Sequence, residues 1–389
     1  MLLERLYDDD LAHASYLIGC QRTGEAIVVD PRRDVQVYLD LAANHGMTIT
    51  AVTETHIHAD YLSGTRELAA RTGATMYVSA EGGPDWQYGP GFDDAIRMLH
   101  GERIALGNLA LEAVHTPGHT PEHLSFLVTD GAAASDPGWA PYLAAGDEQG
   151  FIDALLGDQP DAHAYFARMK RQNRTGPALL GELAPLPQID ASELSAALDE
   201  NSVILLDTRH HSQVHQGTVP GALNVPGQGK AASYAAWVYD PETETRPIVV
   251  LADSTDAAGR FRDHLLRVGI DAVHGFTATL DGLRLAEPKT IAPTDIEQTE
   301  HALLLDVRNR TEYNAGHIPG ATQLSGGRAL WHTEELPASG VILTYCQSGV
   351  RNSVVASALR RAGHDVIEID GSYRAWLAAT GTQPAVNAA

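Results

Sequence analysis

A repeated pattern in the second half of the chain constrains the fold more than any other feature. A short apolar run ending in Asp-x-Arg leads into Gly-x-x-Pro-Gly-Ala, once within residues 203–222 and again within residues 303–321. The copies lie 99 residues apart, and self-similarity at a fixed period indicates repeated structural units. The apolar runs have the length and composition of buried strands. We therefore expect two similar α/β domains in tandem, each with a parallel sheet between helices.

The second copy carries a cysteine in a position that favours chemistry. Cys346 follows the apolar run 341–345 and precedes a stretch with helical spacing from Asn352 to Ala362. The backbone N–H groups of such a loop and the dipole of the next helix stabilise a thiolate and lower its pKa, and Arg351 adds a positive charge. A buried structural cysteine is the alternative, but the order strand, Cys, Gly, Arg favours a loop that can hold a persulfide.

The motifs of this copy resemble those of a rhodanese-type sulfurtransferase domain. Asp-x-Arg, Gly-His-Ile-Pro-Gly-Ala and Cys-x-x-Gly-x-Arg follow one another in that order, and we place the domain at 290–384. The resemblance implies that Cys346 carries sulfane sulfur as a persulfide, supported by Arg351 and Asp306. The loop that would hold the persulfide consists of Gln347, Ser348, Gly349 and Val350.

The earlier copy, which we place at 188–286, departs from this pattern. Asp253 stands at the cysteine position and Ala258 at the position of Arg351. An Asp cannot carry sulfane sulfur, and its charge would repel an incoming anion. We therefore expect a degenerate, non-catalytic rhodanese-like domain with a role in packing or in contacts with a partner.

Two histidine clusters, each directly after a strand-like run, mark the N-terminal segment. The first is His56-Ile-His58-Ala-Asp60, and the second contains His119 after a Pro-Gly turn. Imidazoles and a carboxylate suit borderline divalent ions such as zinc or iron. A histidine-rich surface loop is the alternative, and the second cluster at a suitable distance favours a metal site over it.

This segment resembles the metallo-β-lactamase fold, and within that fold the persulfide dioxygenases that are fused to rhodanese domains. The likeness is carried by Thr55–Gly64, His115–Glu122 and Tyr165–Asn173. It implies an αββα sandwich over 1–178, and hence a multidomain α/β protein overall. The chain runs from Asp147 almost directly into the last of these stretches, so the second half of the fold is shortened.

The resemblance also implies the ligands of a metal site. The resemblance implies that one Fe(II) per chain is bound by His56, His119 and an Asp that follows a Gly, with zinc as the alternative metal. The matching carboxylate is Asp147, and two His with one carboxylate leave positions open for O2 and substrate. Weaker substitutes for that carboxylate are Asp130 and Asp136. The first cluster also contains His58 and Asp60. These two residues would lie behind the metal ligands or bind the metal weakly.

The residue after Asp60 separates two kinds of chemistry. Two-metal hydrolases that this fold contains have a histidine there for the second metal, whereas this chain has Tyr61. The departure disfavours a dinuclear hydrolase and favours a single metal ion.

Charge and cysteine content exclude several classes of function. The formal net charge of −23 argues against binding to nucleic acid or to an anionic membrane, since both need basic patches. No apolar run approaches the roughly 20 residues of a membrane span, and the start lacks a signal-peptide pattern, so we expect a cytoplasmic protein. The two cysteines cannot build a disulfide framework. We expect Cys20 to be a packed side chain, with a persulfide-handling thiol as the alternative.

Together the two sites favour an enzyme of sulfur metabolism. In the leading hypothesis, glutathione persulfide or a similar thiol persulfide is oxidised to sulfite at the iron site, while Cys346 transfers sulfane sulfur that can join sulfite as thiosulfate. The second hypothesis is a sulfurtransferase alone, whose shortened metal domain has lost catalysis. A metal-dependent thioester or lactam hydrolase and a non-catalytic scaffold are the remaining alternatives. A homodimer would cover core that the shortened domain exposes.

Overall fold

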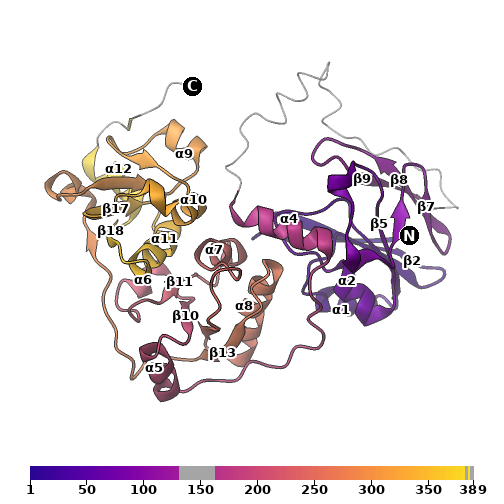
Figure 1. The fold of residues 1–389 in the computed structure, drawn as a ribbon, viewed down its shortest axis with the longest axis horizontal. Coiled ribbons are helices and arrows are strands. Elements are labelled where there is room, and N and C mark those ends of the chain that lie inside the picture. The colour runs from indigo at the N-terminus through magenta and orange to yellow at the C-terminus, as the bar shows by residue number, and fades with distance from the viewer. Residues whose placement is uncertain (131–162, 382–383, 386–389) are drawn as a thin grey trace. The chain divides into compact units, whose positions relative to one another are not determined.

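The computed structural model describes residues 1–130, 163–381 and 384–385, and Figure 1 labels their helices and strands. The chain divides into two compact units. Among the described residues, the first contains 1–130, 166–184 and 266–269, and the second contains 163–165, 185–265, 270–381 and 384–385. No helix in the described ranges is long and apolar enough to cross a membrane.

Two sheets form the first unit. The larger has the strand order β1 (Leu2–Asp8), β2 (His13–Cys20), β3 (Glu25–Val29), β4 (Thr48–Thr53), β5 (Thr75–Ser79) and β6 (Ile96–Met98). Its first two pairs are antiparallel and the remaining pairs are parallel. The smaller, antiparallel sheet consists of β7 (Arg103–Leu106), β8 (Leu109–His115) and β9 (Leu124–Asp130).

Apolar side chains between the two sheets form the core of this unit. Ile27 of the larger sheet belongs to one buried cluster with Leu111 and Leu124 of the smaller sheet. Tyr38 and Leu68 from two helices are fully buried on the other face of the larger sheet. The helices are α1 (Gln36–Asn44), α2 (Thr65–Thr72) and α4 (Tyr165–Thr175), with 3-10 turns η1 (Pro84–Trp86) and η2 (Pro90–Phe92). Packed sheets with helices outside them agree with the predicted fold class.

The second unit contains two parallel sheets, one for each sequence repeat. The first has the order β11 (Leu223–Asn224), β10 (Ile204–Asp207), β12 (Ile248–Leu251) and β13 (Val273–Thr277). The second has the order β14 (Thr290–Ile291), β18 (Asp365–Ile369), β17 (Val341–Tyr345), β15 (Leu303–Asp306) and β16 (Thr322–Gln323). The predicted pair of parallel α/β domains is confirmed.

Helices cover both faces of these sheets (Figure 1). The first repeat has α5 (Ala191–Asp199), α6 (His211–Val214), α7 (Ala231–Val238) and α8 (Thr255–Arg267). The second has η4 (Pro293–Gln298), α9 (Arg310–Ala315), α10 (Gly326–Trp331), η5 (Thr333–Glu335), α11 (Val350–Arg361) and α12 (Ser372–Thr380). Neighbouring residues of β15 point to opposite faces, so Leu305 packs with Val355 of α11 while Leu304 packs with Trp376 of α12. The second repeat is therefore a three-layer structure.

One predicted boundary is wrong in a way that affects the cysteine loop. We predicted the helix after Cys346 from Asn352, but α11 begins at Val350. Gly349 precedes it with φ +108°, a conformation that glycine adopts without strain and that turns the chain directly into the helix. Arg351 therefore belongs to the first turn of α11.

Candidate functional sites

Cys346 lies between the end of β17 and the start of α11, as the sequence predicts. Its side chain is 1% exposed, and its Sγ accepts a hydrogen bond of 3.1 Å from the backbone N–H of Gly349. A Cβ at Gly349 would lie 2.6 Å from Cε1 of His211, so both the positive φ and the close neighbour require glycine there. The loop thus turns a backbone N–H group towards the sulfur atom, where it can stabilise negative charge.

Arg351 is held beside this loop by a carboxylate. Its guanidinium donates two hydrogen bonds of 2.6 and 2.8 Å to Glu312. Burial opposes the charged form, but these bonds outweigh it and raise the pKa of Arg351 above its ordinary value. Glu312 was not predicted as a site residue; its one signal in the sequence is a capping box with Asn309 at the start of α9. Arg351 therefore carries a fixed positive charge next to the thiol.

Asp306 is linked to the cysteine loop through Arg308. The Arg308 guanidinium donates to Asp306 from Nε (3.0 Å) and Nη2 (2.7 Å), and both side chains are almost fully buried. Nη2 also donates to the carbonyl of Gly316 (2.8 Å), and Nη1 donates to Oε1 of Gln347 (3.2 Å). The predicted support of Cys346 by Asp306 thus runs through Arg308, the arginine of the Asp-x-Arg motif, to which no role at the site was assigned from the sequence.

Cys346 lines a cavity of about 1350 Å³ within the second unit. From the predicted persulfide loop, Gln347, Ser348, Val350 and Arg351 line it too. Asp253, which replaces the cysteine in the first repeat, lines the same cavity. The loop that has a cysteine and the loop that lacks one therefore face a common space.

The two histidine clusters meet in the first unit. The N–H of Leu124, at the start of β9, donates to the carbonyl of Thr55 (2.8 Å), which joins the loop after β4 to the turn between β8 and β9. The ring centroids of His56 and His119 lie 4.7 Å apart, and those of His56 and His123 lie 5.2 Å apart. The structure brings the two named histidines together and adds His123, which follows directly after the second sequence motif.

The state of His56 suits a metal ligand. Burial and the neighbouring His58 lower the pKa of His56 to about 2. Its imidazole is therefore neutral, which is the form that binds metals. Its Nδ1 lies 2.9 Å from Oγ1 of Thr55, a contact that orients the ring.

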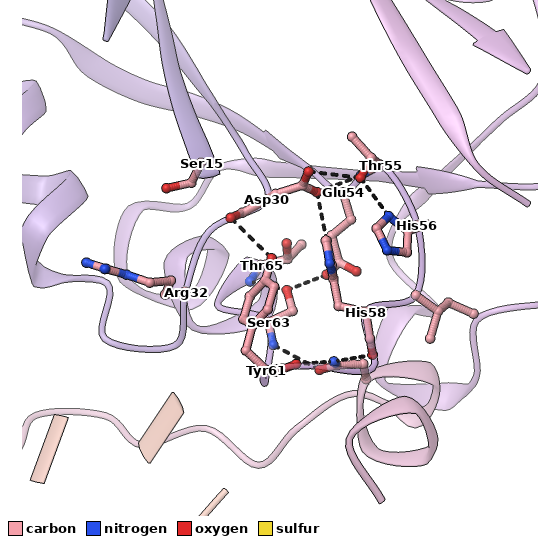
Figure 2. A network of polar contacts seen from close by, with 12 residues as sticks. Ser15, Asp30, Arg32, Glu54, Thr55, His56, His58, Tyr61, Ser63 and Thr65 are labelled. Atoms are coloured by element: carbon pink, nitrogen blue, oxygen red, sulfur yellow. Dashed lines mark hydrogen bonds and ion pairs between the residues drawn. The ribbon is translucent and has the colours of Figure 1, made fainter. Parts of the chain in front are cut away.

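His58 binds a carboxylate instead. Its Nε2 lies 3.0 Å from Oδ1 of Asp30, as Figure 2 shows, and its Nδ1 lies 3.9 Å from Asp60. Burial opposes protonation of His58, but Asp30 outweighs it and raises the pKa of His58 to about 9. Asp30 also accepts hydrogen bonds from the N–H and hydroxyl of Thr55. In this arrangement His58, which was predicted to lie behind the ligands or bind weakly, and Asp30, which was not predicted, support the loop that carries His56.

Asn173 of α4 anchors the same loop from a distant part of the chain. Its Nδ2 donates to the carbonyls of His58 (2.8 Å) and Tyr61 (2.6 Å), and its Oδ1 accepts from the N–H of Ser63 (2.9 Å). The side chain is fully buried. These bonds explain physically why a stretch ending at Asn173 accompanies the histidine motif.

The third predicted ligand has no position in this structure, because Asp147 and its substitute Asp136 lie outside the described residues. The other substitute, Asp130, is wrong. It ends the seven-residue β9, about 20 Å from the histidine turn, and pairs there with the N-terminal ammonium at 3.5 Å.

The donor set fits a metal in part. Within the described ranges, no group of three or more His, Cys, Asp or Glu side chains is arranged to hold a metal ion. The imidazoles of His56 and His119, whose rings meet edge-on, are nevertheless donors that zinc and iron accept. A further ligand would have to come from beyond these ranges.

Cys20 lies in the core of the first unit. It ends β2 and is 3% exposed in the core between the two sheets. Hydrogen bonds from Thr23 and from the N–H of Asn108 lower the pKa of Cys20 to about 7. Its surroundings are those of the packed side chain that we predicted.

Comparisons with known proteins agree with this architecture. The family described as the metallo-beta-lactamase superfamily matches residues 8–132, and the rhodanese-like domain family matches residues 190–280 and 293–379. A crystal structure of a metallo-beta-lactamase from Staphylococcus aureus is similar at 28% identity and a TM-score of 0.60, over 71% of this chain and 98% of that one.

Curated relatives match the N-terminal part. A hydroxyacylglutathione hydrolase of Rhodospirillum rubrum is 34% identical over 30% of this chain and 44% of its own length. A persulfide dioxygenase of Mus musculus is 29% identical over 34% of this chain and 50% of its own length. The chain thus spans about half the length of these relatives. With the fold and the family matches together, the chain consists of a metallo-β-lactamase-superfamily domain followed by two rhodanese-like domains.

Proposed function

We propose that this protein is a two-site sulfur enzyme. Its metallo-β-lactamase domain oxidises a low-molecular-weight thiol persulfide to sulfite, and Cys346 transfers sulfane sulfur. The observation that carries the proposal is the presence, in one chain, of a buried thiol that accepts a backbone hydrogen bond and of the neighbouring imidazoles of His56 and His119. The likeness to a persulfide dioxygenase supports the first activity, and the rhodanese-like domains support the second.

Sulfur transfer follows from the surroundings of Cys346. The thiolate attacks the outer sulfur of the donor, the S–S bond of the donor breaks, and the leaving group departs with the electron pair. That leaving group is sulfite when thiosulfate is the donor and a thiolate when a thiol persulfide is the donor. The N–H of Gly349 and the guanidinium of Arg351 stabilise the negative charge on the bound persulfide. Attack by sulfite on the same outer sulfur gives thiosulfate.

The metal-binding side of the proposal assigns His56 and His119 as ligands of iron, or of zinc in its place, with Asp147 as the carboxylate. When bound, iron would supply the O2 activation that oxidation of the outer sulfur requires. The chain's own contribution is to keep His56 neutral and to hold its loop through the His58–Asp30 contact and the three hydrogen bonds of Asn173. Because a reactive thiol requires a reducing compartment, we assign the protein to the cytoplasm.

Oxygen uptake and sulfur transfer, measured separately, test the two halves. Protein reconstituted anaerobically with iron should consume O2 when glutathione persulfide is added. His56→Ala should abolish this uptake and preserve transfer of sulfur from thiosulfate to cyanide, whereas Cys346→Ser should do the reverse. If the reconstituted wild-type protein showed no persulfide-dependent uptake, the oxidation half of the proposal would be refuted.

Two observations support alternative functions. The incomplete ligand set in the described ranges favours a sulfurtransferase alone, which predicts that His56→Ala changes no activity. The hydroxyacylglutathione hydrolase relative favours thioester hydrolysis. Against that, Tyr61 is fully buried and donates to the carbonyl of Asp30 (3.3 Å), so it packs where a second-metal histidine would stand. Zinc in the purified protein together with thioester turnover would favour the hydrolase.

A further inference from the structure

The two rhodanese-like repeats pack against each other around the cysteine loop. The imidazole of His211, on α6 of the first repeat, lies so close to Gly349 that no Cβ would fit there. Nε1 of Trp331, on α10 of the second repeat, donates to the carbonyl of Trp237 at the end of α7 (3.1 Å). The cavity beside Cys346 therefore has one wall from each repeat, and contacts between the repeats hold the walls in place.

The wall from the first repeat brings charged groups to that cavity. Lys230 at the start of α7 and Arg260 on α8 both line it, and both are exposed. Among the described residues, neither side chain has an ion-pair partner. Asp253 lines the same wall and is also exposed. Arg209, which is paired with Asp207, and Asp281 line the cavity as well. The repeat without a cysteine thus presents both cations and carboxylates to the space in front of the thiol.

The size of the cavity sets the class of ligand. Sites for small molecules measure about 300–1,000 Å³, and the cavity of about 1350 Å³ lies above that range. An inorganic anion such as thiosulfate would fill a small part of it and would leave the carboxylate of Asp253 without a partner. A larger molecule that carries carboxylates and an ammonium group matches both the volume and the two signs of charge.

We infer that the first repeat is the substrate-binding half of the Cys346 site. Lys230 and Arg260 bind the carboxylates, and Asp253 binds the ammonium group, of a peptide thiol persulfide with the chemistry of glutathione. The inference rests on the sulfurtransferase function proposed for Cys346 and assigns its substrate. It also gives the first repeat a role after the loss of its cysteine, since the former reactive position becomes a binding position.

The transfer step needs no other reactant. The Cys346 thiolate attacks the outer sulfur of R–S–SH, and a bond forms between Sγ and that sulfur. The S–S bond of the donor breaks, and the peptide thiolate R–S⁻ leaves with the electron pair while the proton stays on the transferred sulfur. One thiolate is consumed and one is released, so no oxidant or reductant is required. In the reverse direction a peptide thiolate attacks the outer sulfur of the Cys346 persulfide, and the Cys346 thiolate leaves.

Donor preference in the full-length protein tests this inference. The measured quantity is kcat/KM for glutathione persulfide divided by kcat/KM for thiosulfate, with cyanide as the common acceptor and the uncatalysed reaction subtracted. Lys230→Ala/Arg260→Ala should lower this ratio about tenfold, because the carboxylates lose charge-assisted hydrogen bonds in a partly hydrated cavity. The matched control, Arg284→Ala/Lys289→Ala, removes two exposed cations outside the cavity and should change the ratio less than about twofold.

A second donor separates recognition of carboxylates from a general effect of charge. The persulfide of glutathione diethyl ester lacks free carboxylates, so the wild-type protein should use it about tenfold less efficiently than the acid. The Lys230→Ala/Arg260→Ala variant should no longer distinguish the two. An unchanged ratio in that variant, or equal use of ester and acid by the wild type, would overturn the inference and leave the sulfurtransferase intact. Absence of transfer from every donor in the wild type would instead refute the proposed function, and the inference with it.

Discussion

The buried ion pair between Arg308 and Asp306 allows a stability prediction with an internal control. The side chains of this pair are 2% and 0% exposed, and the guanidinium also binds the carbonyl of Gly316 and the amide of Gln347. Arg308→Met keeps most of the volume but leaves Asp306 as a buried carboxylate without its partner. Breaking such a pair costs about 3–5 kcal/mol.

The first repeat contains the corresponding Asp-x-Arg ion pair in a more solvent-exposed position. Arg209 donates to Asp207 (2.9 and 2.6 Å) and to the carbonyl of Gly217 (2.8 Å), but its side chain is 27% exposed. Water can therefore reach the carboxylate once the guanidinium is removed. Arg209→Met should cost about 1–2 kcal/mol, the range for loss of a hydrogen-bonded but solvated partner.

Native-state hydrogen exchange measures the stability of each repeat separately in the intact chain. With about 1.4 kcal/mol for each factor of ten, Arg308→Met should speed exchange of the β17 amides by about a hundredfold or more. Arg209→Met should speed exchange of the β12 amides by about tenfold. The double variant Asp306→Asn/Arg308→Met should recover part of the loss, because no buried charge remains unpaired. Equal effects of Arg308→Met and Arg209→Met in their own repeats would refute the argument from burial.

Three further predictions concern the loops of the two sites. Asn173→Ala removes three buried hydrogen bonds from the histidine loop, so the metal content measured after matched loading should fall; full retention would show that the loop holds its shape alone. Gly349→Ala places a side chain at a positive φ and against His211, and should lower sulfur transfer at least about tenfold; adding His211→Ala to that variant removes the clash alone and should restore only part of the transfer. Burial raises the pKa of Glu312, but hydrogen bonds from Arg351 outweigh this effect and lower that pKa below its ordinary value of 4.5. The stability that this pair contributes is therefore present above pH 4.5 and is lost as the pH falls below it. Glu312→Gln should flatten that part of a thermal-unfolding profile against pH, and an unchanged profile would contradict the assignment.

Features carried by contiguous sequence could be predicted, and features that arise between distant segments could not. The Cys346 loop and the histidine pair His56 and His119 each follow a strand within a short motif, so their positions at strand ends follow from local pattern. Glu312 and Asn173 act through contacts with residues far away in the chain, and no local spacing marks such partners. The start of α11 was missed for a different reason: the left-handed conformation of one glycine shortened the loop.

The charged wall opposite Cys346 shows the same limit most clearly. Lys230 and Arg260 stand in sequence contexts that differ little from those of other surface cations, and Asp253 was read as evidence of lost activity. Their relation to Cys346 exists because two domains of similar fold pack with their loop ends facing one cavity. A sequence repeat predicts that both domains exist, but it does not predict which faces meet.

Comparison of the repeats also separates structural roles from chemical ones at the sulfur site. The first repeat has no cysteine, yet its Asp207–Arg209 pair keeps the ion pair of Asp306–Arg308 and the bond to the glycine carbonyl of the following turn. A pair that persists without the cysteine is required by the fold, since it joins a strand end to that turn. Asp306 is therefore a positioning residue that acts through Arg308. The features that differ between the repeats, a cysteine in place of an aspartate and an arginine in place of Ala258, are the ones that the sulfur chemistry itself requires.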